Sequence, residues 1–360
     1  MSFFAANGVF EMRAPFPFQI SRLTALAALV IGCLLAAGSA GQGAPLAASG
    51  VSDGPVWPSP PMIPRIRYVR SISRPADIGA RPSMWRRAAN WLTGDRGERF
   101  DLQKPAGISV DATGNLCITD TGANRVNYCD LTHKTWRSWD TLGKTRLLSP
   151  VAMVHGAGIF YVADSQLGRV IAFNNDGRVK LEIAAPLQRP VGLALLANTL
   201  VVVDSQLHTV FAFDLQGKLL YQFGKRGTGP GEFNFPTHIT ADQQGHLLVT
   251  DALNSRVEVF SADGHYISEI GSAGDTSGHF GRPKGVAVDA EGHVYVADAV
   301  FDNLQIFDLS GQLLLTLGTS GSAPGEFGLP AGVATGPGDL IYVADSYNHR
   351  VQVLQYLEQP

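Results

Sequence analysis

The chain has 360 residues, of which 40 are Gly, 21 are Pro and 45% are hydrophobic. Its formal net charge of −3 excludes a long-range field that would attract nucleic acid or acidic lipid, although a local charged patch is compatible with it. Nucleic acid is therefore not an expected partner. The length beyond the N-terminal segment, about 295 residues, suits one closed all-β domain.

Residues 1–40 have the layout of an export signal. Basic residues precede an uncharged apolar run over 23–37, and small residues follow it. The run is short for a stable transmembrane span, and the order of the parts is that of a signal peptide. We therefore expect the protein outside the bacterial cytoplasm, in the periplasm or the cell envelope. Both Met1 and Met12 fit as the start of the signal.

Within that run, Cys33 ends the segment Val-Ile-Gly-Cys, which resembles a bacterial lipobox and makes Cys33 the candidate lipidation site. Apolar residues continue after Cys33, where a polar tether is usual. Three outcomes stay open: a lipid anchor at Cys33, a cleaved signal, or an uncleaved N-terminal anchor. A membrane is expected as a partner only through this N-terminus. Residues 41–64, rich in Gly, Ala, Ser and Pro, are typical of an extended tether.

Two elements are predicted between the tether and the rest of the chain. Residues 65–72 contain an isolated strand pattern, Ile-Arg-Tyr-Val-Arg-Ser-Ile. Residues 83–93 carry apolar side chains at helical spacing, and Gly94 follows them, so a short helix is expected there. Its apolar stripe favours packing against its own domain over binding a partner.

Six repeats fill the remainder of the chain. Each repeat opens on Pro and closes on Asp 14 or 15 residues later. The opening prolines, spaced by 45, 40, 46, 47 and 47 residues, are Pro105, Pro150, Pro190, Pro236, Pro283 and Pro330. The closing aspartates are Asp120, Asp164, Asp204, Asp251, Asp298 and Asp345. A period in the forties with several short strands in each unit predicts a six-bladed β-propeller over residues 65–360.

Each repeat contains four strand patterns separated by Asp and Gly turns, as in 285–288, 294–298, 303–307 and 313–317 of repeat five. Following the chain, the loops between the second and third strands and the connections between repeats emerge on one face, called here the front face. The tight hairpins form the back face. The sixth repeat ends before a fourth strand, so residues 65–72 are expected to supply it and close the ring.

Cys117 and Cys129 lie on the second and third strands of repeat one, and hairpin pairing puts them opposite each other or one residue apart. In an oxidising compartment this pair is a candidate for a disulfide, whereas two buried thiols in core positions are the alternative. No haem-attachment motif is present in the sequence. No cofactor is expected.

Two motifs carry a resemblance to a known family. The sequence Tyr-Val-Ala-Asp-x-x-Asn-x-Arg-Val at 342–351 and the connectors Gly-Thr-Gly-Pro-Gly-Glu-Phe at 227–233 and Gly-Ser-Ala-Pro-Gly-Glu-Phe at 321–327 resemble NHL repeats, over residues 105–354. The whole chain is similar to bacterial exported or lipid-anchored NHL proteins of unassigned function. The resemblance implies a propeller that binds a protein or ligand; other members read RNA in animal ligases, and one branch is a zinc-dependent amidating lyase.

The repeated aspartates are interpreted as structural residues and not as catalytic acids. In four of the repeats, an Arg lies five residues after the closing Asp and can form an ion pair with it across the same hairpin. These residues are Arg125, Arg169, Arg256 and Arg350. Thr209 and Asn303 occupy this position in repeats three and five, which leaves Asp204 and Asp298 without that partner.

A metal site is not expected. The lyase branch implies zinc-binding His directly after the opening Pro, and here that position holds Ala106, Val151, Val191, Thr237, Lys284 and Ala331. His238 lies one residue later, and the other histidines expected on the front face come from separate blades, whereas zinc needs several ligands around one point. A metal-dependent lyase or hydrolase with a site at the channel mouth is kept as the rival function.

Apolar residues in the loops between the second and third strands indicate a binding surface. A solvated hairpin is normally polar, yet these loops carry Leu167, Leu207, Leu253, Phe301 and Tyr347. Such residues on one face indicate a partner surface, or else each tucks onto a neighbouring loop. With His238 they form the predicted site of a monomeric, non-catalytic platform that binds a protein or an extended ligand on its front face.

Overall fold

The computed structural model describes residues 54–80 and 100–358. The chain divides into two compact units, Met1–Gly50 and Val51–Pro360, and the description below concerns the second. The export signal over 1–40, Cys33 and the predicted helix over 83–93 lie outside the described residues. Among the described residues, no helix has the length and apolarity needed to cross a bilayer.

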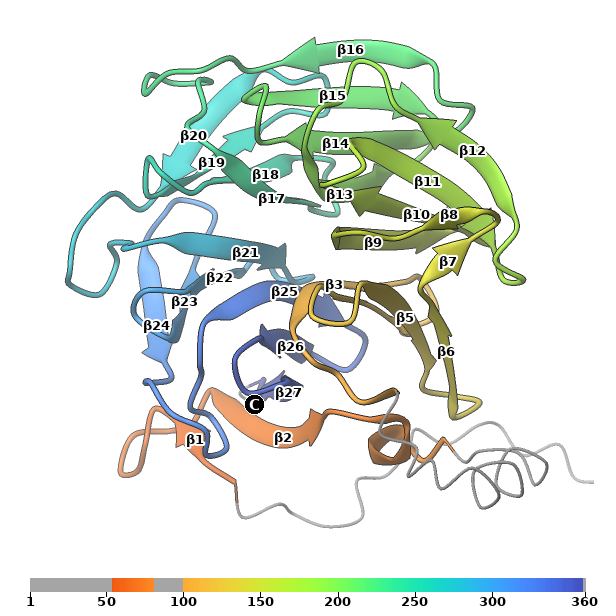
Figure 1. Cartoon of the computed structure of the whole chain (residues 1–360). Helices are drawn as coiled ribbons and strands as arrows, with labels where there is room; N and C mark the ends of the chain where they lie inside the picture. The colour runs from red at the N-terminus through yellow and green to blue at the C-terminus, as the bar shows by residue number, and fades with distance from the viewer. Residues whose placement is uncertain (1–53, 81–99, 359–360) are drawn as a thin grey trace, which may run out of the picture. The chain divides into compact units, whose positions relative to one another are not determined.

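Four-stranded antiparallel sheets, the blades, make up the second unit (Figure 1). The first, innermost strands of blades 1 to 6 are β3 (Pro105–Val110), β9 (Pro150–Gly156), β13 (Pro190–Leu196), β17 (Pro236–Ala241), β21 (Pro283–Val288) and β25 (Pro330–Gly336). The second strands are β4 (Leu116–Asp120), β10 (Ile159–Asp164), β14 (Thr199–Asp204), β18 (Leu247–Asp251), β22 (Val294–Asp298) and β26 (Leu340–Asp345). Every opening Pro therefore begins a strand and every closing Asp ends one.

The outer half of each blade follows the same order. The third strands are β5 (Arg125–Asp130), β11 (Arg169–Asn174), β15 (Thr209–Asp214), β19 (Arg256–Phe260), β23 (Asn303–Phe307) and β27 (Arg350–Tyr356). The fourth strands of blades 1 to 5 are β6 (Thr135–Trp139), β12 (Val179–Ile183), β16 (Leu219–Phe223), β20 (Tyr266–Ile270) and β24 (Leu313–Leu317).

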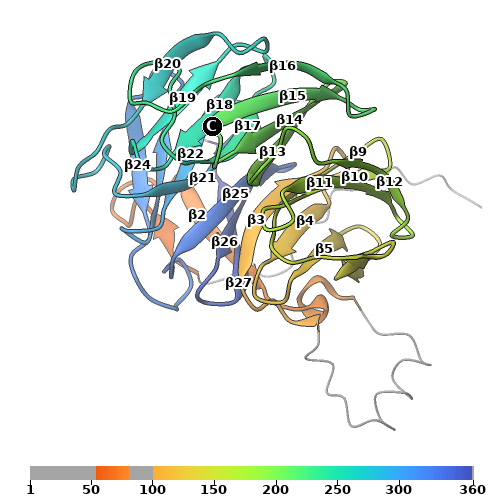
Figure 2. The same ribbon diagram turned by 45° about the horizontal axis from the view of Figure 1, so that its top comes forward.

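The innermost strands contact one another in chain order, and β25 of blade 6 contacts β3 of blade 1, so the six blades form a ring. Figures 1 and 2 show these strands gathered around the centre, with the outer strands at the rim. The structure therefore confirms the predicted all-β, six-bladed propeller.

Blade 6 combines the two ends of the propeller. Strand β2 (Ile66–Ile72) pairs antiparallel with β27, with Ile66 opposite Tyr356 and Ile72 opposite Val351. A fifth strand, β1 (Val56–Trp57), pairs with β2. The expectation that the tether extends to residue 64 is therefore wrong at its end, because the side chain of Trp57 packs on the core of this blade. Two residues are too short a run to show a strand pattern in sequence.

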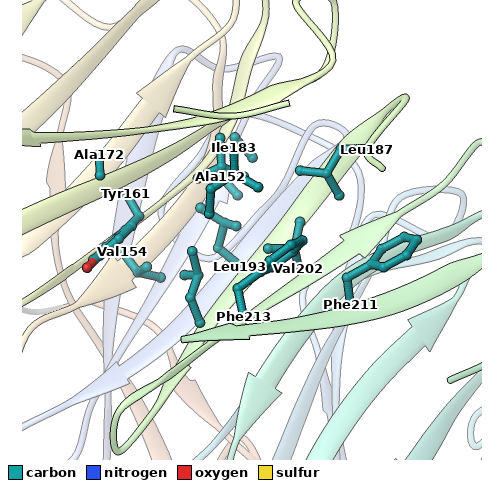
Figure 3. Packing of buried hydrophobic residues seen from close by; sticks show 13 residues of the cluster. Ala152, Val154, Tyr161, Ala172, Ile183, Leu187, Leu193, Val202, Phe211 and Phe213 are labelled. Atoms are coloured by element: carbon teal, nitrogen blue, oxygen red, sulfur yellow. The ribbon is translucent and has the colours of Figure 1, made fainter. Parts of the chain in front are cut away.

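The core lies between adjacent blades. Figure 3 shows the layer between blades 2 and 3, where Tyr161 of β10 and Phe213 of β15 lie among smaller aliphatic side chains. The middle strands of a blade are covered on both sides by neighbouring blades, so they read as nearly continuous hydrophobic runs. The segment Leu200–Val203 of β14, for example, is fully buried.

Phe side chains from the long connectors complete the core on the front side. Phe233 and Phe327, from the two connectors that resemble NHL sequences, are fully buried. Each ring lies against a Gly that follows a fourth strand: a Cβ on Gly224 would come within 2.3 Å of the Phe233 ring, and Gly224 also has a φ of +85°. These connectors are therefore parts of the core and not free loops.

Three short elements were not expected from sequence: a 3-10 turn, η1 (Pro75–Ile78), and the strand pair β7 (Thr141–Leu142) and β8 (Thr145–Arg146). Cys117 and Cys129 are free and buried. Cys117 lies opposite Tyr128 and Cys129 opposite Leu116, so the two thiols are one position out of register and point to opposite faces of the sheet. This register rules out the disulfide, and the alternative of two buried thiols is what the structure shows.

Candidate binding face and channel

The repeated aspartates fix the front face. Each closing Asp is fully buried, and its carboxylate accepts hydrogen bonds from backbone N–H groups just before the opening Pro of the same blade. The shortest such bonds are Gln103 or Lys104 to Asp120 at 2.9 Å, Leu148 to Asp164 at 2.7 Å, Gln188 to Asp204 at 2.6 Å, Asn234 to Asp251 at 2.6 Å, Gly281 to Asp298 at 2.7 Å and Gly328 to Asp345 at 2.7 Å. The carboxylates thus hold the inter-blade connections against the loops, a structural role.

Three of the four expected Asp–Arg bridges form. The guanidinium of Arg125 lies 3.3 Å from Asp120, that of Arg256 lies 3.3 Å from Asp251, and that of Arg350 lies 2.7 Å from Asp345. Arg169 is the exception, because its guanidinium pairs with Glu182 on β12 at 2.8 Å. The prediction of an Asp164–Arg169 bridge is therefore wrong: the Arg169 Nε donates to the Leu167 carbonyl at 3.4 Å, and its side chain is 35% exposed where that of Arg256 is 9% exposed.

The exposure of the predicted apolar loop residues depends on how many positions they follow the closing Asp in the sequence. Two positions after the Asp, the side chains of Leu253, Val300 and Tyr347 are 50%, 57% and 72% exposed. Three positions after it, Leu167, Leu207 and Phe301 are half-buried, and the two Leu side chains pack on hydrophobic clusters.

The physical reason is a turn. The backbone N–H groups of Leu167 and Leu207 each donate to the carboxylate of the preceding Asp at 3.0 Å, which closes the turn. The Val300 N–H donates to Asp298 at 2.9 Å as well, so it is the position in this turn, three residues after the Asp and not two, that directs the side chain toward the blade. Leu167 and Leu207 are therefore not part of an exposed patch, which corrects the sequence prediction.

Sequence reasoning missed two exposed apolar residues on the same face. Phe235 and Leu329, which directly precede the opening Pro of blades 4 and 6, are 37% and 51% exposed. The Leu253 N–H donates to the Asn234 carbonyl, and the Tyr347 N–H donates to the Gly328 carbonyl, so each pair of loops is joined beside these side chains. We call Phe235, Leu253, Val300, Leu329 and Tyr347 the apolar arc; it spans blades 4 to 6. Aligning the residues that precede each opening Pro would have revealed Phe235 and Leu329.

A channel cavity of about 250 Å³ runs between the innermost strands. His238 lines it from β17, so the placement of this residue on the front-face loops is wrong: the second position after the opening Pro points into the ring. Burial, together with the nearby charge of Lys284, lowers the pKa of His238 to about 4. The imidazole is therefore neutral at physiological pH.

At the strand ends of blades 1 and 2, a buried polar network reaches the channel. The Tyr128 hydroxyl donates to Asp111 at 2.7 Å, and His155 Nδ1 lies 2.9 Å from the same carboxylate oxygen. Burial opposes the charge on Asp111, but hydrogen bonds from Thr113, Tyr128, Asn115 and His155 outweigh it and lower the pKa of Asp111 to about 2. The Nε2 atom of His155 is buried and has no hydrogen-bond partner.

The described residues contain no group of three or more His, Cys, Asp or Glu side chains arranged to hold a metal ion. Together, the ring, the front face and the channel define the chain as a six-bladed β-propeller.

Family comparisons agree with this class. The NHL repeat model matches residues 102–126 and 327–354, and a family described as a 6-bladed beta-propeller matches residues 184–247 and 241–317. The chain is thus a six-bladed propeller, and two of its segments match the NHL repeat model. No curated protein matches it.

Solved structures share the fold at low identity. Virginiamycin B lyase from Staphylococcus aureus is 15% identical with a TM-score of 0.52, and the match covers 71% of this chain and 96% of that one. Hydrazine synthase from Kuenenia stuttgartiensis is 13% identical with a TM-score of 0.53, covering 72% and 97%. An auxiliary nutrient binding protein from Bacteroides thetaiotaomicron is 14% identical with a TM-score of 0.56, covering 71% and 70%. Likeness at this level concerns the fold alone.

Proposed function

We propose that this protein is a non-catalytic binding platform of the bacterial cell envelope, which holds a protein or an extended ligand on its front face. The observation that carries the proposal is the apolar arc: five large hydrophobic side chains are exposed on adjacent blades of one face. An exposed apolar patch of this kind is typical of a partner surface. The loops that present it are fixed by the buried aspartates, so the surface is preorganised for binding.

The environments of the buried aspartates and of the apolar arc favour binding over catalysis. The buried aspartates are occupied by backbone N–H groups, and the exposed residues of the arc are apolar. A nutrient binding protein is among the structures that share the fold, which is consistent with a binding role. Export through the N-terminal segment is part of the proposal and rests on the sequence of residues 1–40.

The test is partner capture by the purified full chain from a cell-envelope extract. Leu253→Ala and Tyr347→Ala should each weaken retention of the partner by about 1–3 kcal/mol, because a few side chains that become buried at the centre of an interface carry most of its binding energy. Leu220→Ala is the matched control, since Leu220 on β16 is 49% exposed and Leu253 is 50% exposed. Glu291→Ala on the back face is a second control. Equal retention by all four variants would overturn the proposal.

A lyase or hydrolase is the second candidate, and the Asp111–His155 pair is the observation that favours it. A carboxylate that orients an imidazole is a common arrangement for a general base, and lyases are among the structures of the same fold. The discriminating measurement is metal analysis of the purified protein. A stoichiometric ion that is lost on His238→Ala or His155→Ala would favour the enzyme over the platform.

A further inference from the structure

Basic side chains surround the front mouth of the channel. The residue that precedes the opening Pro is Lys104 in blade 1, Arg189 in blade 3 and Arg282 in blade 5, and all three side chains are exposed. These are alternate blades of the ring. Lys284, the second residue of β21, adds a half-buried basic side chain at the start of this innermost strand.

The backbone holds three of these residues in equivalent places. The N–H groups of Lys104, Arg189 and Arg282 donate to the closing Asp of their own blades at 2.9, 2.7 and 3.1 Å. The same position in blades 2, 4 and 6 holds Ser149, Phe235 and Leu329, and none of these is acidic. The repeat architecture therefore brings cations to one mouth. None of the six positions is acidic, but the carboxylate of Asp302 reaches this ring and accepts the Leu329 N–H at 2.7 Å.

None of the four cations has a partner within the described part of the chain: no ion pair and no side-chain hydrogen bond is formed by Lys104, Arg189, Arg282 or Lys284. Asp204 and Asp298 are the closing carboxylates of blades 3 and 5, and they are buried and bound to backbone N–H groups. Burial lowers the pKa of Lys284, and the charges of Arg282, Arg189 and Lys104 lower it further. Like charges repel, so this arrangement costs free energy when it is empty.

We infer that the front mouth of the channel is a binding site for a compact anionic group, either a carboxylate or a phosphate, held by Lys104, Arg189, Arg282 and Lys284. Guanidinium groups bind both anions with paired hydrogen bonds, and an ammonium adds a point charge. Four cations at one mouth suit a single multivalent anion, whereas an extended nucleic acid needs a basic stripe that follows its backbone. The inference rests on the proposed function, because it names the chemistry of a ligand on the same face.

The test is calorimetric titration of the full chain at low ionic strength with citrate and, separately, with inorganic phosphate. We expect one anion to bind per chain, and Arg282→Ala/Lys284→Ala to weaken that binding by at least about tenfold. If citrate binds more tightly, the natural ligand carries a carboxylate; if inorganic phosphate binds more tightly, it carries a phosphate. Lys180→Ala/Lys218→Ala removes the same charge from the outer strands and the back face, and it should leave the affinity unchanged.

If Arg282→Ala/Lys284→Ala fails to fold, Lys104→Ala/Arg189→Ala serves as a second variant, because both of its residues are exposed. It should weaken anion binding in the same way. Equal affinity in the mouth variants and the control would overturn the inference. So would tighter binding of single-stranded DNA with a salt dependence that reports more than about four phosphate contacts. Tyr347→Ala should leave citrate and phosphate binding intact. Failure of anion binding with partner capture still dependent on Tyr347 would therefore reject this site and keep the proposed function.

Discussion

Glu258→Gln on β19 should stabilise the propeller and remove a pH dependence of its stability. Glu258 is fully buried, its Oε1 accepts the N–H of Gly231 at 3.1 Å, and its Oε2 has no hydrogen-bond partner. The equivalent positions in blades 5 and 6 hold Gln305 and Gln352, whose amide nitrogens donate to backbone carbonyls at 2.8 and 2.6 Å. A Gln at position 258 would supply the donor that a carboxylate lacks.

The magnitude follows from the pKa of Glu258. Burial raises this pKa from its ordinary value of 4.5 to about 7, against the attraction of Arg256 at 2.9 Å. A raised pKa favours the protonated folded state, so the contribution of Glu258 is fully present below pH 4.5 and is lost as the pH rises through 7. The shift corresponds to at most about 3 kcal/mol of unfolding free energy.

The assay is urea unfolding of both proteins between pH 4.5 and pH 8. The stability advantage of Glu258→Gln should grow by up to about 3 kcal/mol over this range. Gln305→Glu is the mirror control and should introduce a pH dependence at least as large, because Asn303 stands where blade 4 has Arg256 and supplies no charge to lower the pKa of the new carboxyl. An advantage that stays constant with pH would refute the reasoning.

Three further predictions concern the N-terminal segments and the repeat motif. A chain that begins at Met84 lacks β1 and β2, leaves the outer edge of β27 unpaired and should aggregate or show a markedly lower Tm; a Tm equal to that of the full chain would contradict the role of β2. Cys33→Ala should release the protein from membranes if the lipobox is used, and unchanged fractionation, followed by determination of the mature N-terminus, would separate a cleaved signal from an uncleaved anchor. Arg256→Ala should lower the unfolding free energy by about 3–5 kcal/mol, because it leaves Asp251 and Glu258 buried without their cation. Arg169→Ala should lower it by less than about 1 kcal/mol, because the pair of Arg169 with Glu182 is exposed. Equal losses of the two variants in urea unfolding would contradict this assignment.

The fold was predictable because the sequence repeats its signals six times. Pro and Asp mark the ends of strands in every blade, and chain direction alone assigns the loops to two faces. The details of the front face were less accessible. Leu253 and Leu207 differ by one position relative to the Asp, and only the packing of Leu207 on the core cluster shows that its side chain turns inward while Leu253 stays exposed.

The channel mouth shows a second limit of sequence reasoning. Lys104, Arg189 and Arg282 are far apart in the chain, and a net charge of −3 hides them. Closure of the ring brings them to one opening. Likewise, Arg169 fits the repeat motif as well as Arg256 does, and each pairs with a Glu on the adjacent strand, yet only Arg256 also bridges its Asp. Contacts that depend on side chains from different strands or blades were therefore the part that the repeat pattern did not reveal.

The central claim, that the front face binds the partner, is tested most directly by photo-crosslinking in living cells. A photoreactive phenylalanine analogue would replace Tyr347 in one chain and Leu220 in another, since both side chains are exposed but only Tyr347 lies in the apolar arc. We predict a discrete crosslinked adduct from position 347 and none from position 220. An adduct from position 220 alone, or adducts of equal yield from both, would contradict the account.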